Sequence, residues 1–413
     1  MLDSAIFWIL FSFFVLYFLL ERVLDFLTLR HLSPQLPSEF EGFCSPERYA
    51  SIQAYTKDSL RFGQIEDIFD FLLFVIFWIL GGFSFLDRHV AHFFAHPIFD
   101  GWLLIGVLGF AMSLLQIPFD VYSTFVLDER HGLNRTTART FVLDRIKGLF
   151  LSVLIGGPLL AALIAFFQWL GSWAWLIGWG FFFVVSLVLQ YLSPTLILPL
   201  FNRFEPLPEG DLRSRIEQLA QRANFPLNGI FVMDGSRRSA RSNAFFTGFG
   251  RKKRIVLFDT LIEKNTPEEI EAVLAHELGH FKMRHVMTGM LLGQLEAGLM
   301  FFLLSQFLHY EPLFAAFGVH TPSIPMGLVL FGLAYSPLQF FLAIAGNVLS
   351  RHHERQADAF AKQIIGDGRP LAMALCKLSI DNLSNLTPPP VVVFLHASHP
   401  PVLERIRTLE TSS

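Results

Sequence analysis

The chain has 413 residues, of which 53% are hydrophobic and 16% charged, and its mean hydropathy is +0.48. This composition is too apolar for an ordinary soluble protein. The formal net charge of −3 leaves no excess of cations to neutralise phosphates, which excludes a nucleic-acid binder. Cys44 and Cys376 are too few for a disulfide framework or a four-cysteine zinc module, and we expect both to be buried or interfacial thiols.

Seven apolar stretches are candidates for transmembrane helices, each of which needs about 20 such residues. They are residues 4–20, 71–86, 102–119, 148–170, 173–189, 286–308 and 325–349. The first is interpreted as an uncleaved span, because it lacks a basic start and a small-residue cleavage pattern. The second is short and contains Gly81 and Gly82. The sixth carries Gln294 and Glu296, which either face a water-filled interior or hydrogen-bond to a neighbouring helix.

The distribution of cations between the spans predicts the orientation. Five lysines and arginines lie between the first and second spans and five between the third and fourth, whereas Arg88 alone lies between the second and third. Because cytoplasmic loops retain positive charge, we expect the N-terminus outside and the polar stretches 202–285 and 351–413 in the cytoplasm. The compact chain, without a lysine-rich tail at Thr411, Ser412 and Ser413, favours a bacterial inner membrane; in a eukaryote we expect the ER membrane.

The pattern predicts a mainly helical, multi-spanning membrane protein with a small α+β domain on one side. We divide it into a membrane region with five spans, a catalytic region, the last two spans and a second catalytic region, at residues 1–199, 200–285, 286–350 and 351–413. The catalytic region contains an amphipathic helical pattern at 212–223 and β-like runs at 229–233 and 254–258, separated by a glycine- and serine-rich segment. A helix starting near Thr266 is expected to run into the sixth span.

The chemical signal is an H-E-x-x-H motif formed by His276, Glu277 and His280. Histidines at i and i+4 project from one face of a helix, so both can bind one zinc ion. The intervening Glu277 can then hold and deprotonate a water molecule beside the metal. The alternative is a pair of solvated histidines with a surface glutamate, because this short motif also occurs by chance.

A catalytic zinc ion needs a third protein ligand, and the polar segment after the seventh span offers Glu354. Asp358 lies on the same helical face and can orient a ligand histidine, or it is a surface acid. His352 and His353 compete for the ligand role, or they cap the span as interfacial histidines. We expect one Zn²⁺ per chain.

These motifs occur in an order that resembles the type I CAAX prenyl proteases, which are multi-spanning zinc metallopeptidases with H-E-x-x-H and E-x-x-x-D motifs. The resemblance covers most of the chain and adds several blocks to the zinc motifs. The matching blocks are residues 118–125, 131–134, 198–202, 235–239, 242–245, 253–261, 354–358 and 398–401. It implies about seven transmembrane helices around a barrel-like chamber, capped by the zinc-binding domain.

The resemblance also implies roles for three further residues. Asn243 matches a motif that pairs with an extended substrate as an added strand beside an edge strand. The family more often has Tyr where this chain has Phe245, which removes a hydroxyl group. His399 matches a histidine that stabilises the oxyanion, and otherwise it is a turn residue. Arg405 can receive a substrate carboxylate, or it is a plain surface cation.

The sequence therefore predicts a zinc metalloendopeptidase that is embedded in the lipid bilayer. Its expected substrates are peptides or proteins, including membrane-associated or lipidated ones. A quality-control protease of broader specificity would use the same residues. A transporter or scaffold with a structural zinc site is the third alternative, although no cysteine lies near enough to supply a fourth ligand.

Overall fold

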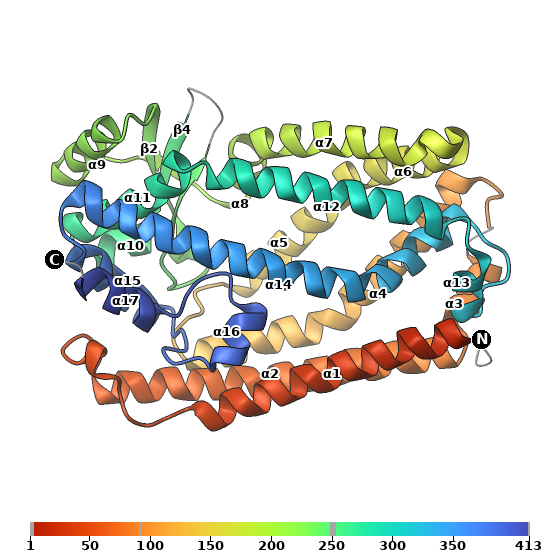
Figure 1. Cartoon of the computed structure of the whole chain (residues 1–413), viewed down its shortest axis with the longest axis horizontal. Helices are drawn as coiled ribbons and strands as arrows, with labels where there is room; N and C mark the ends of the chain where they lie inside the picture. Colours follow the sequence, from red (N-terminus) through yellow and green to blue (C-terminus); the bar gives the residue numbers. More distant parts are fainter. Residues whose placement is uncertain (1–3, 91–92, 248–252, 412–413) are drawn as a thin grey trace.

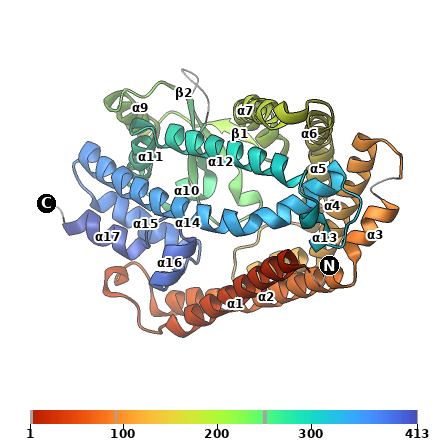
Figure 2. The ribbon, with the colours of Figure 1, turned by 45° about the vertical axis from the view of Figure 1, so that its right-hand side comes forward.

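Long helices run along the molecule and gather the polar regions at one end. The structure, a computed structural model, describes residues 4–90, 93–247 and 253–411, so Ser412, Ser413 and part of the predicted glycine-rich segment lie outside it. The small sheet and the C-terminal helices lie at one end of the long helices, and the N-terminus lies at the other (Figure 1). The view turned by 45° shows the same separation (Figure 2).

Among the residues that the structure describes, six helical segments are long and apolar enough to cross a membrane, and a bent pair brings the number to seven if it counts as one span. The helices that form them are α1 (Ala5–His31), α2 (Pro46–Ile79), α3 (Gly82–His89), α4 (Pro97–Tyr122), α5 (Ala138–Leu151), α6 (Gly157–Trp169), α7 (Ala174–Leu192), α12 (His285–Phe307) and α14 (Ile324–Ile365). Single π-helical turns extend or join some of them at η2 (Ser123–Asp128), η3 (Ser152–Gly156) and η5 (Ser193–Ile197). The multi-spanning fold class is thus confirmed.

The second predicted span, residues 71–86, is wrong as a single helix. Helix α2 has 34 residues and ends at Ile79, and α3 starts at Gly82 after a bend of 63°. Gly81 adopts φ +78°, a left-handed conformation that glycine accepts without a steric penalty. Hydropathy did not reveal this turn of the backbone, because the turn falls inside a continuous run of apolar residues.

The expected continuation of the zinc-motif helix into the sixth span is also wrong. Helix α11 (Pro267–Lys282) ends, and α12 begins at His285. Between them Arg284 adopts φ +59°, which turns the chain away from the first helix axis. No glycine or proline marks this break, so the sequence pattern did not reveal it.

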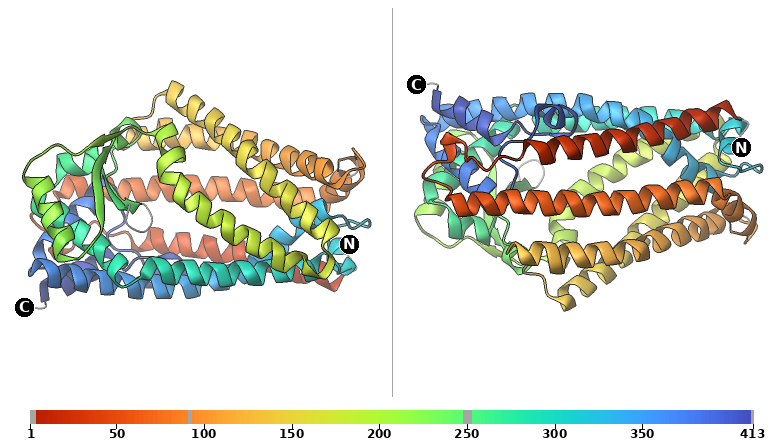
Figure 3. Two further views of the ribbon diagram at one scale, coloured as in Figure 1. Left: turned by 90° about the horizontal axis from the view of Figure 1, so that it is seen from above. Right: turned by 90° about the horizontal axis from the view of Figure 1, so that it is seen from below.

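The spans form a wall of helices around an interior. Between 0% and 17% of the residues in each apolar window are buried, far fewer than in a tight bundle, where every helix buries one face. Helices α7 and α12 lie nearest the viewer when the molecule is seen from above, and α1 and α2 lie nearest when it is seen from below (Figure 3). This arrangement agrees with the predicted barrel-like chamber.

The two polar residues of the sixth span behave differently. The Gln294 side-chain amide donates a hydrogen bond to the Ser186 hydroxyl of α7 at 3.2 Å, so it joins two helices. The Glu296 side chain is exposed. A carboxylate facing lipid is costly, so the exposure of Glu296 is compatible with a position facing a water-filled interior.

A four-stranded sheet with helices around it forms the polar end. The strands β1 (Phe204–Pro206), β2 (Leu227–Met233), β3 (Ala244–Thr247) and β4 (Lys253–Phe258) lie in the order β1-β2-β4-β3, with β2 and β4 parallel and the other pairs antiparallel. The order makes β3 an edge strand. The helices of this end are α8 (Leu198–Phe201), α9 (Asp211–Arg222), α10 (Asp259–Lys264), α11, α15 (Arg369–Asp381), α16 (Pro390–His396) and α17 (Val402–Thr411), while α13 (Glu311–Ala316) lies at the opposite end.

The hydrophobic core of this end draws on segments far apart in the sequence. Side chains of α9, the sheet, α11, α15 and α17 pack together with Phe40 from the connection between α1 and α2, and with Tyr49 and Ile52 from the first turns of α2. Cys44 and Cys376 are both free, buried thiols of this core, as predicted. The core therefore joins residues on both sides of position 199, where we predicted a domain boundary.

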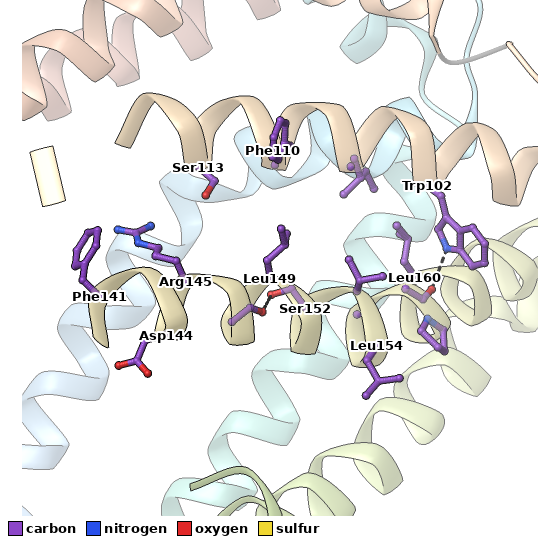
Figure 4. Close-up of a pocket in the computed structure, with 18 of the residues that line it drawn as sticks. Trp102, Phe110, Ser113, Phe141, Asp144, Arg145, Leu149, Ser152, Leu154 and Leu160 are labelled. Atoms are coloured by element: carbon purple, nitrogen blue, oxygen red, sulfur yellow. Dashed lines mark hydrogen bonds between the residues drawn. The ribbon is translucent and has the colours of Figure 1, made fainter. Parts of the chain in front are cut away.

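A cavity of about 1230 Å³ lies between α4 and the α5–α6 segment (Figure 4). Apolar side chains such as Phe110 and Leu149 line most of it, and Asp144 and Arg145 lie at its polar end. None of the metal-site candidates named above lines this cavity, so we do not assign it to the hydrolytic site.

Arg238 ties the membrane region to the polar end. Its guanidinium donates to both carboxylate oxygens of Asp144 in α5, at 2.8 and 3.1 Å, and to the Asn202 side chain at 2.9 Å. The backbone of Arg238 accepts a hydrogen bond from the Arg135 N–H in the cation-rich loop after the third span. This loop therefore meets the polar end.

We expect Arg238→Ala to destabilise the fold by about 1–3 kcal/mol, because the substitution leaves half-buried acceptors unpaired. Thermal denaturation of the detergent-purified protein measures this loss as a lower Tm. Arg237→Ala is the matched control, since Arg237 is the exposed neighbour in the same loop. Equal melting temperatures for the two variants would contradict the role of Arg238.

Candidate active site

Helix α11 has a strong start that fixes its position. The Thr266 hydroxyl accepts a hydrogen bond from the Glu269 N–H, and the Glu269 carboxylate accepts one from the Thr266 N–H, which forms a capping box. Pro267 follows at the first helical position, where its missing N–H costs nothing. Glu269 also accepts a hydrogen bond from Lys377 Nζ of α15 at 2.7 Å. The helix is therefore anchored before it reaches His276.

Three side chains from two helices converge on one point. His276 and His280 lie one turn apart on α11, with their Nε2 atoms 3.2 Å apart. Glu354 of α14 approaches from the other side, its carboxylate oxygens 3.4 Å from His276 Nε2 and 3.1 Å from His280 Nε2. Within residues 4–90, 93–247 and 253–411, no other group of three His, Cys, Asp or Glu side chains places its metal-ligand atoms within 4.8 Å of one another.

The chemistry of this cluster fits a metal ion. Two imidazole nitrogens and one carboxylate are the donor set of a catalytic metal site that keeps an open position. Oε2 of Glu354 is buried without a hydrogen-bond partner among the described residues. Arg405 Nη1 and His276 Nε2 each lie 3.4 Å from this oxygen without forming a hydrogen bond, so a metal ion between the three side chains would be a closer partner for it.

A close contact between helices brings the two parts of the cluster together. Gly279 of α11 lies so near Ala357 of α14 that a Cβ atom at Gly279 would be 3.0 Å from the Ala357 Cα and 3.2 Å from its carbonyl oxygen. Ala357 is itself fully buried. Small residues at both positions let the backbones approach, and this approach sets the reach of Glu354 to the histidines.

Asp358 and Arg405 lie behind His276. Asp358 Oδ1 is 2.8 Å from His276 Nδ1, the ring nitrogen that faces away from the cluster. Arg405 of α17 donates to both Asp358 oxygens, at 2.8 and 2.7 Å, and its side chain is 9% exposed. The Asp358 carboxylate thus contacts the side of the His276 ring opposite the cluster, and Arg405 pairs with that carboxylate. Because its guanidinium is buried and engaged, Arg405 is not a surface cation, and this arrangement favours a positioning role over capture of a substrate carboxylate.

The surrounding charged groups and burial shift the pKa values of His276 and Glu277 in α11. Burial lowers the pKa of His276, but hydrogen bonds to Asp358 and Glu354 outweigh burial and raise the pKa to about 9. A metal ion must therefore displace a proton to bind His276. Burial also raises the pKa of Glu277, against the nearby histidines that lower it. A carboxyl group with a raised pKa suits proton transfer near neutral pH.

His399 reaches the cluster from the loop between α16 and α17. Its Nε2 is 3.4 Å from Glu354 Oε1, its Nδ1 is 2.9 Å from the Ser398 hydroxyl, and the side chain is 63% exposed. It therefore lies at the open side of the cluster, where a substrate can reach it.

Asn243 lies just before β3, the edge strand. Its backbone carbonyl accepts a hydrogen bond from the Phe258 N–H, and its side-chain oxygen accepts one from the Ala244 N–H. The residue is exposed. The predicted position beside an edge strand is correct, and Phe245 follows within the strand.

The sequence analysis missed a second set of contacts, behind His280. His285, the first residue of α12, places its Nδ1 3.1 Å from His280 Nδ1 and its Nε2 2.9 Å from Gln356 Oε1. His353 stacks flat on the His285 ring, with centroids 4.0 Å apart, and lies outside the three-residue cluster. The signal in the sequence was a histidine five positions after His280, at the break between the helices.

Comparisons with known proteins agree with this arrangement. A family profile described as the CAAX prenyl protease N-terminal region with five membrane helices matches residues 25–203, and one described as peptidase family M48 matches residues 206–413. The chain is 39% identical to a CAAX prenyl protease 1 homolog of Arabidopsis thaliana, an alignment that covers 97% of this chain and 96% of the relative. It is 33% identical to CAAX prenyl protease 1 of Saccharomyces cerevisiae, over 97% and 94%.

A solved structure supports the same fold. The crystal structure of S. mikatae Ste24p superposes with a TM-score of 0.92 and 32% sequence identity. The match covers 98% of this chain and 99% of that one. The arrangement of the membrane helices and the polar end is therefore shared along nearly the whole length.

We expect Gly279→Ala to weaken metal binding several-fold and to destabilise the protein by about 1–3 kcal/mol, because the added methyl group forces α11 away from α14. Metal content after dialysis against a chelator, together with Tm, measures both effects. Gly289→Ala in α12 is the control, since nothing lies within 4 Å of the position that a Cβ atom would take there. Unchanged metal retention in Gly279→Ala would show that this contact does not set the ligand distances.

We expect Arg405→Ala to lower metal affinity by about 10–100-fold, because Asp358 loses the cation that fixes it behind His276. Chelator competition measures this affinity. Arg407→Ala is the control, because Arg407 lies on the same helix with a 61% exposed side chain. A raised KM with unchanged metal affinity would instead support a contact between Arg405 and a substrate carboxylate.

Proposed function

Because the chain belongs to the CAAX prenyl protease branch of the M48 metallopeptidases and is a multi-pass membrane metalloendopeptidase, we propose that its metal is a single zinc ion held by His276, His280 and Glu354. The observation that carries this proposal is the convergence of these three side chains from α11 and α14, with ligand atoms within 4.8 Å. Two imidazoles and one carboxylate favour zinc, and no fourth protein ligand of a closed structural site is present among the described residues of the cluster.

In the proposed reaction, Glu277 is the general base and then the general acid. The zinc ion supplies Lewis acidity toward water and the peptide carbonyl. Glu277 takes a proton from the attacking water and passes it to the amide nitrogen as the C–N bond breaks. His399, at the open side of the cluster, donates a hydrogen bond to the oxyanion of the tetrahedral intermediate. Asp358 holds His276 in the orientation that the ligand role requires.

The edge strand β3 offers a place for the substrate. A peptide in extended conformation can add to its free edge, and Asn243 then contacts the substrate backbone at the start of the strand. The names of the relatives support lipidated C-terminal peptides as the substrate class. The interior lined by the spans is the route by which such a membrane-bound chain reaches the site. A quality-control protease that accepts many unfolded proteins remains the second candidate, since it would use the same cluster.

The proposed orientation places the active site in the cytoplasm and the N-terminus outside. The cation-rich loop after the third span touches the polar end, and the N-terminus lies at the opposite end (Figure 1). The membrane is the inner membrane in a bacterium or the ER membrane in a eukaryote. Accessibility of single introduced cysteines to an impermeant reagent tests this orientation in intact membranes.

The decisive test compares the detergent-purified protein with Glu277→Ala on a farnesylated peptide, its unmodified counterpart and an unstructured reporter protein. We expect about one zinc ion per chain in both proteins, and cleavage by the wild type that falls at least 100-fold in the variant, as for loss of a general base. Zinc is measured by elemental analysis.

The substrate preference separates the candidates. Preference for the farnesylated peptide over its unmodified counterpart supports trimming of lipidated C-termini, whereas equal cleavage of the reporter supports quality control. Zinc bound to both proteins without cleavage of any substrate would favour a transporter or scaffold instead.

A further inference from the structure

The hydrogen bonds behind His280 can be assigned a donor and an acceptor at each step. His285 is 8% exposed and lies between His280 and Gln356, with one ring nitrogen facing each of them. The left-handed turn at Arg284 folds α12 back so that His285 faces α11. Stacking on His353, at an interplanar angle of 8°, fixes the plane of the His285 ring. The ring thus has one position and two polar neighbours.

The positions of the protons follow from what each atom can do. A neutral imidazole has one N–H donor and one lone pair, and a ligand histidine uses its lone pair on the metal. Nε2 of His280 faces His276 and Glu354, so its Nδ1 must carry the proton. His280 then donates to Nδ1 of His285.

The remainder of the chain of hydrogen bonds agrees with this assignment. Because His285 Nδ1 accepts a hydrogen bond, its proton lies on Nε2, 2.9 Å from Gln356 Oε1. A carbonyl oxygen can only accept, which matches an N–H donor. The arrangement at Gln356 is therefore compatible with the proton order that a metal ion at His280 requires.

We infer that His285 and Gln356 are positioning residues that hold His280 in the tautomer whose Nε2 lone pair faces the metal. The inference rests on the proposed role of His280 as a zinc ligand. The two ligand histidines are then held differently, His276 by the carboxylate of Asp358 and His280 by a neutral imidazole and amide. The relay extends the site to α12, so that α12 joins α11, α14 and α17 in forming it.

Three substitutions at one position test the direction of the relay. Gln356→Glu keeps an acceptor of the same shape, Gln356→Met removes the hydrogen bond at similar size, and Gln356→Lys offers only a donor. A donor would reverse both tautomers and place a proton on His280 Nε2. We expect zinc affinity within about threefold of the wild type for Glu, about 10-fold weaker for Met and about 100-fold weaker for Lys.

Zinc affinity is measured by chelator competition on the full-length protein in detergent, and the visible absorption of the cobalt-substituted protein reports ligand geometry independently of activity. Melting temperatures of the metal-free proteins show whether each variant is folded. If Gln356→Lys does not fold, the comparison of Met with Glu decides.

Equal zinc affinity in the folded variants would overturn the inference while the wild type still bound zinc and cleaved peptide. Failure of the wild type to bind zinc would overturn the proposed function itself. The two failures are therefore distinguishable in one experiment.

Discussion

The packing of α11 against α14 is the constraint on which the active site depends. On the proposed assignment, the H-E-x-x-H motif supplies two metal donors and a base on one helix, whereas the third donor lies more than 70 positions away in the sequence. Gly279 and Ala357 let the two backbones meet, and the helix surfaces beside that contact are where His276, His280 and Glu354 project. The capping box at Thr266 and the ion pair of Glu269 with Lys377 hold α11 in place for this contact.

The charges around this contact are balanced. Glu277, Glu354 and Asp358 are three carboxylates in a largely buried site, and Arg405 is the cation that the described structure places among them. A divalent zinc ion together with Arg405 would neutralise the three carboxylates. The relay behind His280 keeps that balance, because the neutral His285 ring and the Gln356 amide add no formal charge. The two histidines thus have different partners, a carboxylate that pairs with Arg405 behind His276 and neutral groups behind His280.

Local patterns predicted most of the helices and the chemical motif, and long-range contacts account for what was missed. Runs of apolar residues located the spans, and helical spacing grouped His276, Glu277 and His280. Hydropathy does not report the left-handed residues Gly81 and Arg284, where the expected helices break. The pairing of Arg405 with Asp358 joins two helices whose relative position depends on the whole core, so spacing along the chain could not show it.

The length of α14 has a mechanical consequence. A helix of 42 residues extends about 63 Å at 1.5 Å per residue, twice the roughly 30 Å of a hydrocarbon layer. Its first part is the apolar span, and its second part carries Glu354 and Asp358 to the polar end, within about 5 Å along the axis of Ala357 at the crossing with α11. Pro337 lies in the first part, where its ring and its missing N–H favour a kink, so α14 is not one straight rod. A change of tilt in the apolar part can therefore be taken up at Pro337, about 25 Å along the axis from Glu354, before it reaches the contact between α11 and α14.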